Sequence, residues 1–308
     1  RKMKEMPEPQ ESQARPSWMS SGVCTECRCS RLRRTRRNIL LLAAAIAVLA
    51  ATRTALSSPA LVPSGLPFRV GMCQTVVERD KHASLAHVHA AVEAAASRGA
   101  ELIVFGEMLT CPYDLHKFRD YGERLPLEGA HPSAEDAPTA KLLFDLAREH
   151  GVWIVGGSLP EVANELVFNT CLVFSPDGGI VARHRKAHLF DVDVPETQGR
   201  QTASFRESEV ISAGNKATLV DLPWCRMGVG ICYDMRFPEY ASTLRKHGAK
   251  LLVYPAAFSM ATGPPHWSVL ARGRAVDTQS YVVAVSTARS HLPGNYQVWA
   301  HSMLVGPW

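Results

Sequence analysis

Short apolar runs alternate with amphipathic stretches along the chain from Phe68 onward. Runs of strand length lie at Phe68–Thr75, Leu102–Phe105, Val152–Ser158, Phe168–Phe174, Val181–His184, Met227–Ile231 and Met303–Val305. Amphipathic stretches of helical length lie at Asp80–Arg98, Thr139–His150 and Pro238–His247, and a polar turn is expected at Glu161–Glu165. Because strands and helices alternate, the pattern predicts an α/β domain whose sheets are covered by helices.

The first predicted helix has recognisable ends and one apolar face. Asp80 can accept hydrogen bonds from the first backbone N–H groups, and Gly99 follows the last turn, where glycine commonly ends a helix. Leu85, Val88 and Val92 recur at helical spacing. We therefore expect these three side chains to face the core.

Residues 1–66 differ in composition from the rest of the chain. Five arginines between Arg31 and Arg37 precede an unbroken apolar run at 39–51, and a stretch rich in Ser, Pro and Ala follows. The 13 residues of that run would form a helix of about 20 Å, shorter than a bilayer span. The segment is therefore predicted to be a targeting or disordered stretch preceding a folded domain at 67–308, with membrane contact confined to 39–51. The alternative is that upstream sequence was translated from a wrong start site.

The net charge of +5 is concentrated in this first segment. Residues 1–66 hold 11 of the 34 Lys and Arg and 4 of the 29 Asp and Glu, so residues 67–308 are slightly acidic. Nucleic-acid binding needs a basic stripe on the folded surface, so no nucleic-acid partner is predicted. An apolar content of 46% over 308 residues suffices for a large core and excludes disorder throughout the chain.

Eight cysteines in 308 residues fall well below the density of a disulfide-stapled domain. Those in or beside apolar runs are expected to be reduced thiols: Cys73, Cys111, Cys171, Cys225 and Cys232. Cys24, Cys27 and Cys29 lack a second pair of metal ligands nearby, so no metal site is predicted.

Chemically active side chains follow three of the predicted strands. Glu107 comes after the second strand, Lys186 lies just beyond Val181–His184, and Cys232 directly follows Met227–Ile231. Functional groups of open α/β sheets gather outside the carboxyl ends of the strands. We therefore expect these three residues to meet at one site.

The surroundings of Cys232 favour a nucleophile over a small core residue, which a lone Cys after an apolar strand more often is. Gly228 and Gly230 allow close approach, and Asp234 and Arg236 are poor core residues. A thiol at a strand-to-helix turn beside a cation has a lowered pKa and attacks as the thiolate. Cys232 is expected to behave in this way.

Three blocks around these residues resemble the nitrilase superfamily of carbon–nitrogen hydrolases. The blocks are Glu107 with Pro112-Tyr113, Arg185–Pro195 and Gly230–Glu239, in the order found in the family. The resemblance covers Phe68–Trp308. It implies a four-layer α-β-β-α sandwich with a single catalytic domain, which hydrolyses carbon–nitrogen bonds other than peptide bonds.

The same resemblance assigns catalytic roles. Cys232 would attack the amide carbon and form a thioester. Glu107 would act as general base and acid, and Lys186 with the backbone N–H of Tyr233 would stabilise the oxyanion. Glu207 matches the family's second glutamate, which helps orient the lysine and the substrate.

Within the family the chain most resembles the omega-amidases, enzymes of nitrogen metabolism that cleave the terminal amide of 2-oxoglutaramate and 2-oxosuccinamate. A pocket for such substrates pairs a carboxylate with a cation. Arg236 is the candidate cation, and Tyr113, Tyr233 and Phe258 are the other candidate substrate-binding residues. The alternative is an amidase of deaminated glutathione or another small-amide or carbamoyl hydrolase of the family.

Three further alternatives compete with this assignment. A membrane acyltransferase built on the same hydrolase domain would need several membrane spans, and the sequence has only one marginal apolar segment. His188 or His266 could serve as the base of a Cys–His hydrolase, although the three blocks already supply a base. A catalytically silent interaction module is also conceivable for this fold. The presence of Glu107, Lys186 and Cys232 together argues against it.

The resemblance also implies partners, compartment and missing parts. It implies no cofactor and no metal, and pairing into a homodimer or larger homo-oligomer. The protein is expected to be intracellular, either cytoplasmic or, if residues 1–66 are a genuine signal, in a mitochondrion or plastid. Family chains continue beyond Trp308, so the C-terminal part is expected to be truncated, and Glu196–Ser204 is expected to add an extra polar loop.

Overall fold

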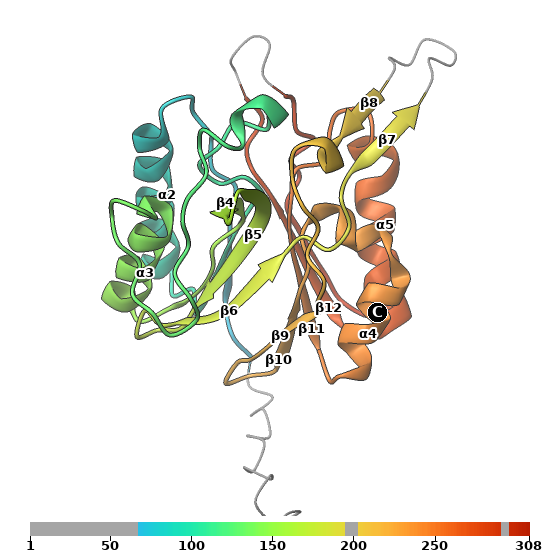
Figure 1. Cartoon of the computed structure of the whole chain (residues 1–308). Helices are drawn as coiled ribbons and strands as arrows, with labels where there is room; N and C mark the ends of the chain where they lie inside the picture. Colours follow the sequence, from blue (N-terminus) through green and yellow to red (C-terminus); the bar gives the residue numbers. More distant parts are fainter. Residues whose placement is uncertain (1–66, 195–202, 291–295) are drawn as a thin grey trace, which may run out of the picture. The chain divides into compact units, whose positions relative to one another are not determined.

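The structure is a computed structural model, and it describes residues 67–194, 203–290 and 296–308 (Figure 1). The predicted targeting segment at 1–66 and most of the loop at 196–204 lie outside the described residues. Two β-sheets pack face to face, and helices cover their outer faces: α2 (Lys81–Ser97) and α3 (Pro138–His150) on one, α4 (Pro238–Lys246) and α5 (Gly263–Thr278) on the other. This arrangement confirms the predicted α-β-β-α sandwich.

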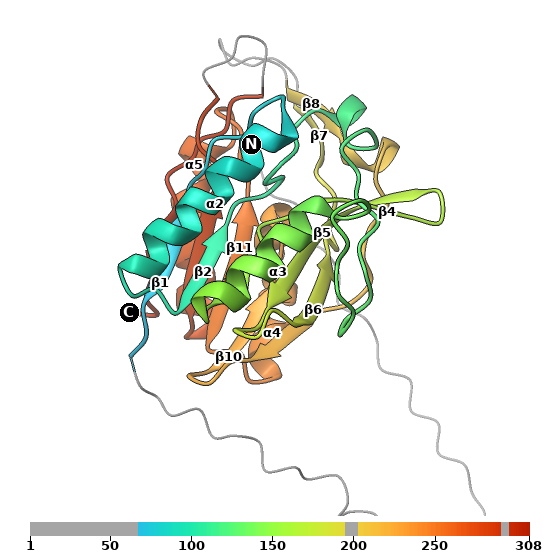
Figure 2. The ribbon, with the colours of Figure 1, turned by 90° about the vertical axis from the view of Figure 1, so that its left-hand side faces the viewer.

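The first sheet has six strands, and its helices lie over it in Figure 2. Its order is β1 (Val70–Cys73), β2 (Leu102–Phe105), β3 (Trp153–Val155), β5 (Leu166–Phe174) and β4 (Leu159–Ala163), with β6 (Ile180–Arg185) also paired to β5. β1, β2 and β3 are parallel, whereas β5 runs antiparallel to its three partners. The carboxyl ends of β1, β2 and β3 therefore lie at the same edge of the sheet, and Glu107 follows β2 at that edge.

The second sheet has five strands. Its order is β13 (Met303–Val305), β12 (Tyr281–Ser286), β11 (Leu251–Ala256), β10 (Arg226–Val229) and β9 (Thr218–Asp221). A small antiparallel pair, β7 (Asp191–Val194) and β8 (Ala203–Arg206), connects the sheets along the chain. Short 3₁₀ helices lie at Leu115–Lys117, Glu207–Glu209 and Cys232–Arg236.

Alternate residues of β2 serve two cores because successive side chains of a strand point to opposite faces. Leu102 and Val104 join the cluster between the sheets, which includes Val229 of β10. Ile103 and Phe105 join the cluster beneath α2 and α3. The strand is thus buried on both faces, which explains its unbroken apolar sequence.

Two sequence expectations were wrong in detail. Ser84, not Leu85, is the fully buried residue of the first α2 turn, and its hydroxyl accepts a hydrogen bond from Glu78 N at 2.9 Å. The predicted polar turn begins later than expected, because Glu161 lies in β4. Its buried carboxylate is paired with Arg183 at 3.0 Å and Arg185 at 2.7 Å, so the strand tolerates the charge.

The two sheets approach each other closely at Gly106, directly after β2. A Cβ atom there would lie 2.3 Å from Thr287 N and 2.5 Å from Ser286 C, so only glycine fits. The next amide, Glu107 N, donates to Ala256 O at the end of β11 over 3.5 Å. This contact holds Glu107 at the junction between the sheets.

The described cysteines Cys73, Cys111, Cys171, Cys225 and Cys232 are all free thiols, as expected. None of the helices in the described ranges has the length and apolarity needed to span a bilayer.

Candidate active site

Glu107 and Lys186 meet where the two sheets adjoin. Lys186 follows β6 directly, and its Nζ atom lies 2.9 Å from Oε1 of Glu107. Both side chains are buried, the lysine completely. The structure thus brings together two of the three residues that the strand-end pattern had selected.

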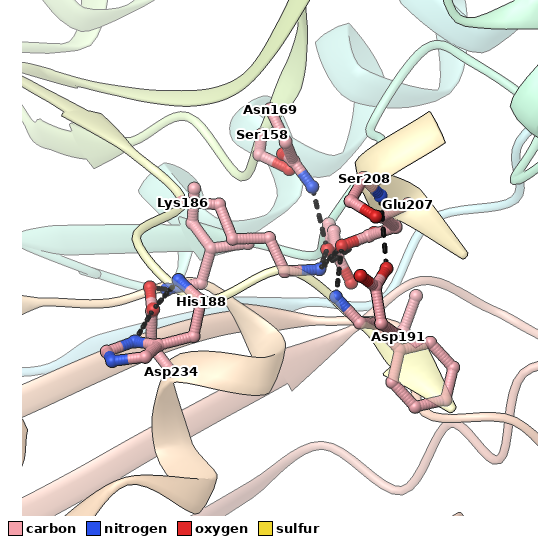
Figure 3. Close-up of polar contacts among 12 residues, drawn as sticks. Ser158, Asn169, Lys186, His188, Asp191, Glu207, Ser208 and Asp234 are labelled. Carbon is pink, nitrogen blue, oxygen red and sulfur yellow. Dashed lines mark hydrogen bonds and ion pairs between the residues drawn. The ribbon is translucent and has the colours of Figure 1, made fainter. Parts of the chain in front are cut away.

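Glu207 supplies a second carboxylate to the same ammonium group. Its Oε1 and Oε2 atoms lie 2.9 and 2.8 Å from Lys186 Nζ, and Oε2 also accepts the backbone N–H of Phe190 at 2.7 Å. Figure 3 shows Lys186 reaching toward Glu207 from the side of His188. Lys186 is therefore held between two buried carboxylates.

Two neutral groups complete the polar cluster. The Asn169 amide, in β5, donates to Glu107 Oε1 at 2.8 Å. The Tyr113 hydroxyl donates to Glu207 Oε1 at 2.5 Å and lies 3.3 Å from Glu107 Oε1. Asn169 was not singled out from the sequence, although a buried amide inside the apolar run Phe168–Phe174 was a usable signal.

Opposing charges and burial set the protonation of the cluster. Burial raises the pKa of Glu107, Lys186 lowers it and Glu207 raises it again, leaving it above the usual value. Burial alone would lower the pKa of Lys186, but the two carboxylates outweigh burial and hold it well above its usual value. Lys186 is therefore a permanent cation, and Glu107 is a carboxylate that readily takes up a proton.

Cys232 begins the short helix beyond β10 in a left-handed conformation, with φ of 44°. Its side chain is buried beside Glu107, close enough for the two groups to shift each other's pKa. Burial and the Glu107 carboxylate raise the pKa of the thiol well above its usual value, although Lys186 and the Ala257 N–H lower it. The expectation of a lowered thiol pKa was therefore wrong, and attack requires a base to remove the proton.

An aromatic pocket faces Cys232, with a cation in its wall. Phe190, Tyr233, Phe258 and other side chains enclose about 10 Å³, room for about one water molecule, so a substrate has to displace some of them. The Arg236 guanidinium lies 5.1 Å from the Phe258 ring and 5.4 Å from the Tyr233 ring. All of the predicted substrate-binding residues, Tyr113 included, line this pocket.

Arg236 has no carboxylate partner in the described part of the chain. Its Nη2 atom lies 3.2 Å from His266 Nδ1, and its buried Nε atom has no hydrogen-bond partner there. Burial lowers the pKa of this guanidinium from its ordinary value, and the neighbouring Cys232 raises it. The pocket therefore contains a partly buried cation that can bind an anionic group of a ligand.

A larger cavity of about 780 Å³ adjoins the pocket on the far side of two stacked tyrosines. The rings of Tyr113 and Tyr296 lie 4.8 Å apart and line both spaces. Glu107 lines the larger cavity, as do the cationic side chains of Arg79 and Lys117. The two tyrosines therefore lie between a narrow space lined by Cys232 and a wide one lined by Glu107.

The histidines proposed for a Cys–His hydrolase have other partners. His188 Nδ1 lies 2.7 Å from Asp234 Oδ1, and the ring stacks on Phe237 with centroids 3.7 Å apart. His266 contacts Arg236. Within the described ranges, no group of three or more His, Cys, Asp or Glu side chains is arranged to hold a metal ion.

Comparisons with known proteins show the family of this chain. The carbon–nitrogen hydrolase family model matches residues 69–308. The chain is 42% identical to the chloroplastic omega-amidase of Arabidopsis thaliana over 81% of this chain and 67% of that protein. It is 42% identical to omega-amidase NIT2 of Danio rerio over 78% of this chain and 81% of that protein.

A solved structure shares the fold. Saccharomyces cerevisiae Nit3, a member of branch 10 of the nitrilase superfamily, superposes with a TM-score of 0.68 and 36% sequence identity, over 78% of this chain and 82% of that one. An amidase from Nesterenkonia superposes with a TM-score of 0.62 and 23% identity, which supports the fold alone. This chain belongs to the carbon–nitrogen hydrolase family and is a hydrolase of carbon–nitrogen bonds other than peptide bonds.

Proposed function

We propose that this protein is an omega-amidase, which hydrolyses 2-oxoglutaramate and 2-oxosuccinamate to the 2-oxo acid and ammonia. The observation that carries the proposal is the pairing of a nucleophile with a cation in one pocket: Cys232 and Arg236 line the same narrow space. The relatives named omega-amidase, of Arabidopsis thaliana and Danio rerio, support the same substrate class.

The first chemical step is attack by Cys232 on the terminal amide carbon. Glu107 removes the thiol proton as the sulfur–carbon bond forms, because the thiol is protonated at neutral pH. Oε1 of Glu107 is held by Lys186 and Asn169, whereas Oε2 is buried without a hydrogen-bond partner among the described residues. Oε2 is therefore the oxygen suited to receive the proton.

The amide oxygen gains negative charge as the tetrahedral intermediate forms. Lys186, charged and immobilised, and the backbone N–H of Tyr233 would stabilise this oxyanion, and one such donor contributes about 2.7–4 kcal/mol in comparable enzymes. Glu207 and Tyr113 keep the ammonium group in place. A fixed donor needs no reorganisation during the reaction.

Collapse of the intermediate releases ammonia and leaves a thioester on Cys232. Glu107 gives the captured proton to the departing nitrogen and then takes a proton from the water molecule that attacks the thioester. The carbon–sulfur bond breaks, the 2-oxo acid leaves, and the thiol is regenerated. The atoms balance with water as the only co-reactant, so no metal or cofactor is required.

Arg236 would hold the substrate carboxylate at the other end of the pocket. Its guanidinium lies near two aromatic rings and His266 and forms no ion pair within the described ranges, which leaves its charge available to a ligand. Phe258 and Tyr233 would exclude water from the carbon chain between the carboxylate and the amide. The fit favours short dicarboxylic monoamides over neutral amides.

Deaminated glutathione is the second candidate substrate, because it is a longer amide and the cavity of about 780 Å³ beyond Tyr113 could hold its extra length. The deciding experiment measures release of 2-oxoglutarate from both compounds by the full chain, because deaminated glutathione carries cysteinylglycine on its amide nitrogen and releases that dipeptide instead of ammonia. A kcat/KM at least about 100-fold higher for 2-oxoglutaramate supports the omega-amidase. A preference for deaminated glutathione refutes the substrate assignment and keeps the reaction class.

We also propose that the protein forms a homodimer or larger homo-oligomer. Val269 and Val276 of α5 are 69% and 56% exposed, and Tyr281 at the start of β12 is 54% exposed, which is apolar surface that association would cover. Sedimentation of the full chain tests the proposal. A monomer at all concentrations would contradict it.

We propose that residues 1–66 are a targeting signal that directs the protein to an organelle. The basic and apolar composition of this segment and the chloroplastic relative support it. A fusion of residues 1–66 to a fluorescent protein should accumulate in a mitochondrion or plastid. Uniform cytoplasmic fluorescence would refute the proposal.

A further inference from the structure

Asp234 is a fully buried carboxylate two residues after Cys232. Its Oδ2 atom accepts hydrogen bonds from Ile231 N at 2.8 Å and from His184 Nε2 at 3.0 Å. Its Oδ1 atom accepts from His188 N at 2.9 Å and from His188 Nδ1 at 2.7 Å. Figure 3 shows Asp234 and His188 facing each other below Lys186.

The backbone donors belong to the two turns that carry the proposed catalytic residues. Ile231 immediately precedes Cys232 beyond β10, in the second sheet. His188 follows Lys186 by two residues beyond β6, in the first sheet. One carboxylate therefore joins the Cys232 turn to the Lys186 turn across the interface between the sheets.

The Cys232 turn depends on such support. A residue other than glycine in the left-handed region is destabilised by about 1–2 kcal/mol, and Cys232 has a φ of 44°. The hydrogen bond from Ile231 N to Asp234 Oδ2 closes this turn on its N-terminal side. Strain at a functional residue persists only where the surroundings fix it.

Asp234 acts as a charged acceptor. Burial opposes its ionisation, but the hydrogen bonds from His184 and His188 outweigh burial and hold its pKa well below the usual range. Hydrogen bonds to an ionised acceptor are about twice as strong as those between neutral groups. The four bonds therefore make a stiff connection at neutral pH.

Each histidine is fixed by a second contact. His184 is fully buried, and its Nδ1 atom lies 3.1 Å from Thr218 Oγ1. His188 stacks on Phe237, with ring centroids 3.7 Å apart. The two fixed rings thus hold the Asp234 carboxylate in one orientation.

We propose that Asp234 is a positioning residue that keeps the Cys232 turn and the Lys186 turn in register. The nucleophile and the oxyanion donor must reach the same amide group, and displacement by about 1 Å lowers a rate by about 100-fold. Asp234 does not touch the substrate in this account. The inference rests on the proposed amidase function and goes beyond it by assigning a role to the Asp234, His184 and His188 cluster.

Two sets of variants test the role. Asp234→Asn removes the charge and replaces one acceptor by a donor. His188→Ala removes the side-chain donor to Oδ1, whereas His188→Asn keeps an N–H donor near the position of Nδ1. Glu123→Gln is the matched control. Buried Glu123 also accepts a backbone N–H, from Thr139, and pairs with a lysine, Lys81, but its carboxylate contacts the start of α3 and not the two turns.

Two readouts are measured on the full chain: kcat and KM for 2-oxoglutaramate, and the rate at which iodoacetamide alkylates Cys232, followed by mass spectrometry. The second readout needs no substrate. If the wild type does not hydrolyse 2-oxoglutaramate, the proposed function fails, while the alkylation rates still test the positioning role.

We expect Asp234→Asn to lower kcat about 100-fold with KM changed less than about threefold. His188→Ala should lower kcat about tenfold, and His188→Asn should restore most of it. Alkylation should slow in Asp234→Asn and His188→Ala, because Lys186 lowers the pKa of the thiol only while it is held nearby. Glu123→Gln should lower the melting temperature and leave both readouts unchanged.

The proposal is overturned if folded Asp234→Asn keeps the wild-type kcat and alkylation rate, or if Glu123→Gln impairs both readouts equally. If Asp234→Asn does not fold, the His188 pair decides: equal activity of His188→Ala and His188→Asn would reject the positioning role.

Discussion

The Nζ atom of Lys186 lies 2.9 Å from Oε1 of Glu107, while Oε2 of the same carboxylate is buried with no hydrogen-bond partner in the described chain. The two oxygens therefore have different environments. One is tied to a permanent cation, and the other is left for a proton. In the proposed mechanism, this asymmetry would allow a single carboxylate both to orient the oxyanion donor and to act as a base.

The fall of kcat/KM at acid pH should follow the protonation of Glu107. Burial first, and then the charge of Glu207, raise the pKa of Glu107, so kcat/KM should fall as the pH drops through a value above the ordinary glutamate pKa of about 4.3. Glu207→Gln removes a nearby negative charge, which favours the Glu107 carboxylate and should move this fall to lower pH. Glu209→Gln, on the same helical turn but exposed, is the control. A fall that stays at the same pH or moves to higher pH in Glu207→Gln contradicts the assignment.

Lys186 should be needed for both catalysis and stability. Lys186→Met removes the oxyanion donor and should lower kcat about 100–1,000-fold. It also leaves Glu107 and Glu207 buried without their cation, which should lower the free energy of unfolding by about 3–5 kcal/mol. Urea unfolding and steady-state kinetics measure the two effects.

Adding Glu207→Gln to Lys186→Met separates the two roles of the lysine. The double variant removes one of the two uncompensated charges and should recover part of the lost stability without recovering kcat. Recovery of activity along with stability would show that Lys186 acts only as a structural partner.

Arg236 should control affinity for the substrate carboxylate. Arg236→Met removes a charged hydrogen-bond donor, an interaction of about 1.5–3 kcal/mol, and should raise KM for 2-oxoglutaramate about 10–100-fold with little change in kcat. Hydrolysis of a neutral amide of similar length should be unaffected. Lys246→Met, which removes an exposed cation at the end of α4, is the control. An unchanged KM in Arg236→Met would rule out Arg236 as the residue that binds the substrate carboxylate.

Asp234 should make stability depend on acid pH. Its folded-state pKa is depressed, so its contribution is fully present above the unfolded value of about 3.9 and is lost as the pH falls toward the folded value. Asp234→Asn should be less stable than the wild type near neutral pH, and the difference should shrink below about pH 3.9. Asp120→Asn, at an exposed position, is the control. Parallel stability curves for wild type and Asp234→Asn would contradict this linkage.

The strand-end pattern correctly predicted that Glu107, Lys186 and Cys232 follow strands, because a parallel α/β fold brings carboxyl ends to one edge. It could not predict the partners of Lys186. Glu207 directly follows β8, and the pairing of β7 with β8 brings it to Lys186. Hydrophobic periodicity did not predict this contact, and only the family resemblance pointed to Glu207. Asn169 contributes from within an apolar strand, where local pattern gives a polar residue little weight.

Asp234 shows the limit of composition rules. It was identified as a poor core residue, yet it is completely buried, because His184 and His188 provide donors from about 50 residues away in sequence. Such compensation depends on tertiary contacts and is invisible in a local window. The raised thiol pKa was missed for the same reason: burial and Glu107 outweigh the cation that the sequence suggested.

The most direct test of the central claim is to trap the thioester on Cys232. The full chain is mixed with 2-oxoglutaramate, quenched in acid during turnover, digested and examined by mass spectrometry, beside the Cys232→Ala variant. We predict an acyl adduct on the peptide that contains Cys232 and no ammonia release by the variant. Ammonia release that persists in Cys232→Ala would contradict the mechanism.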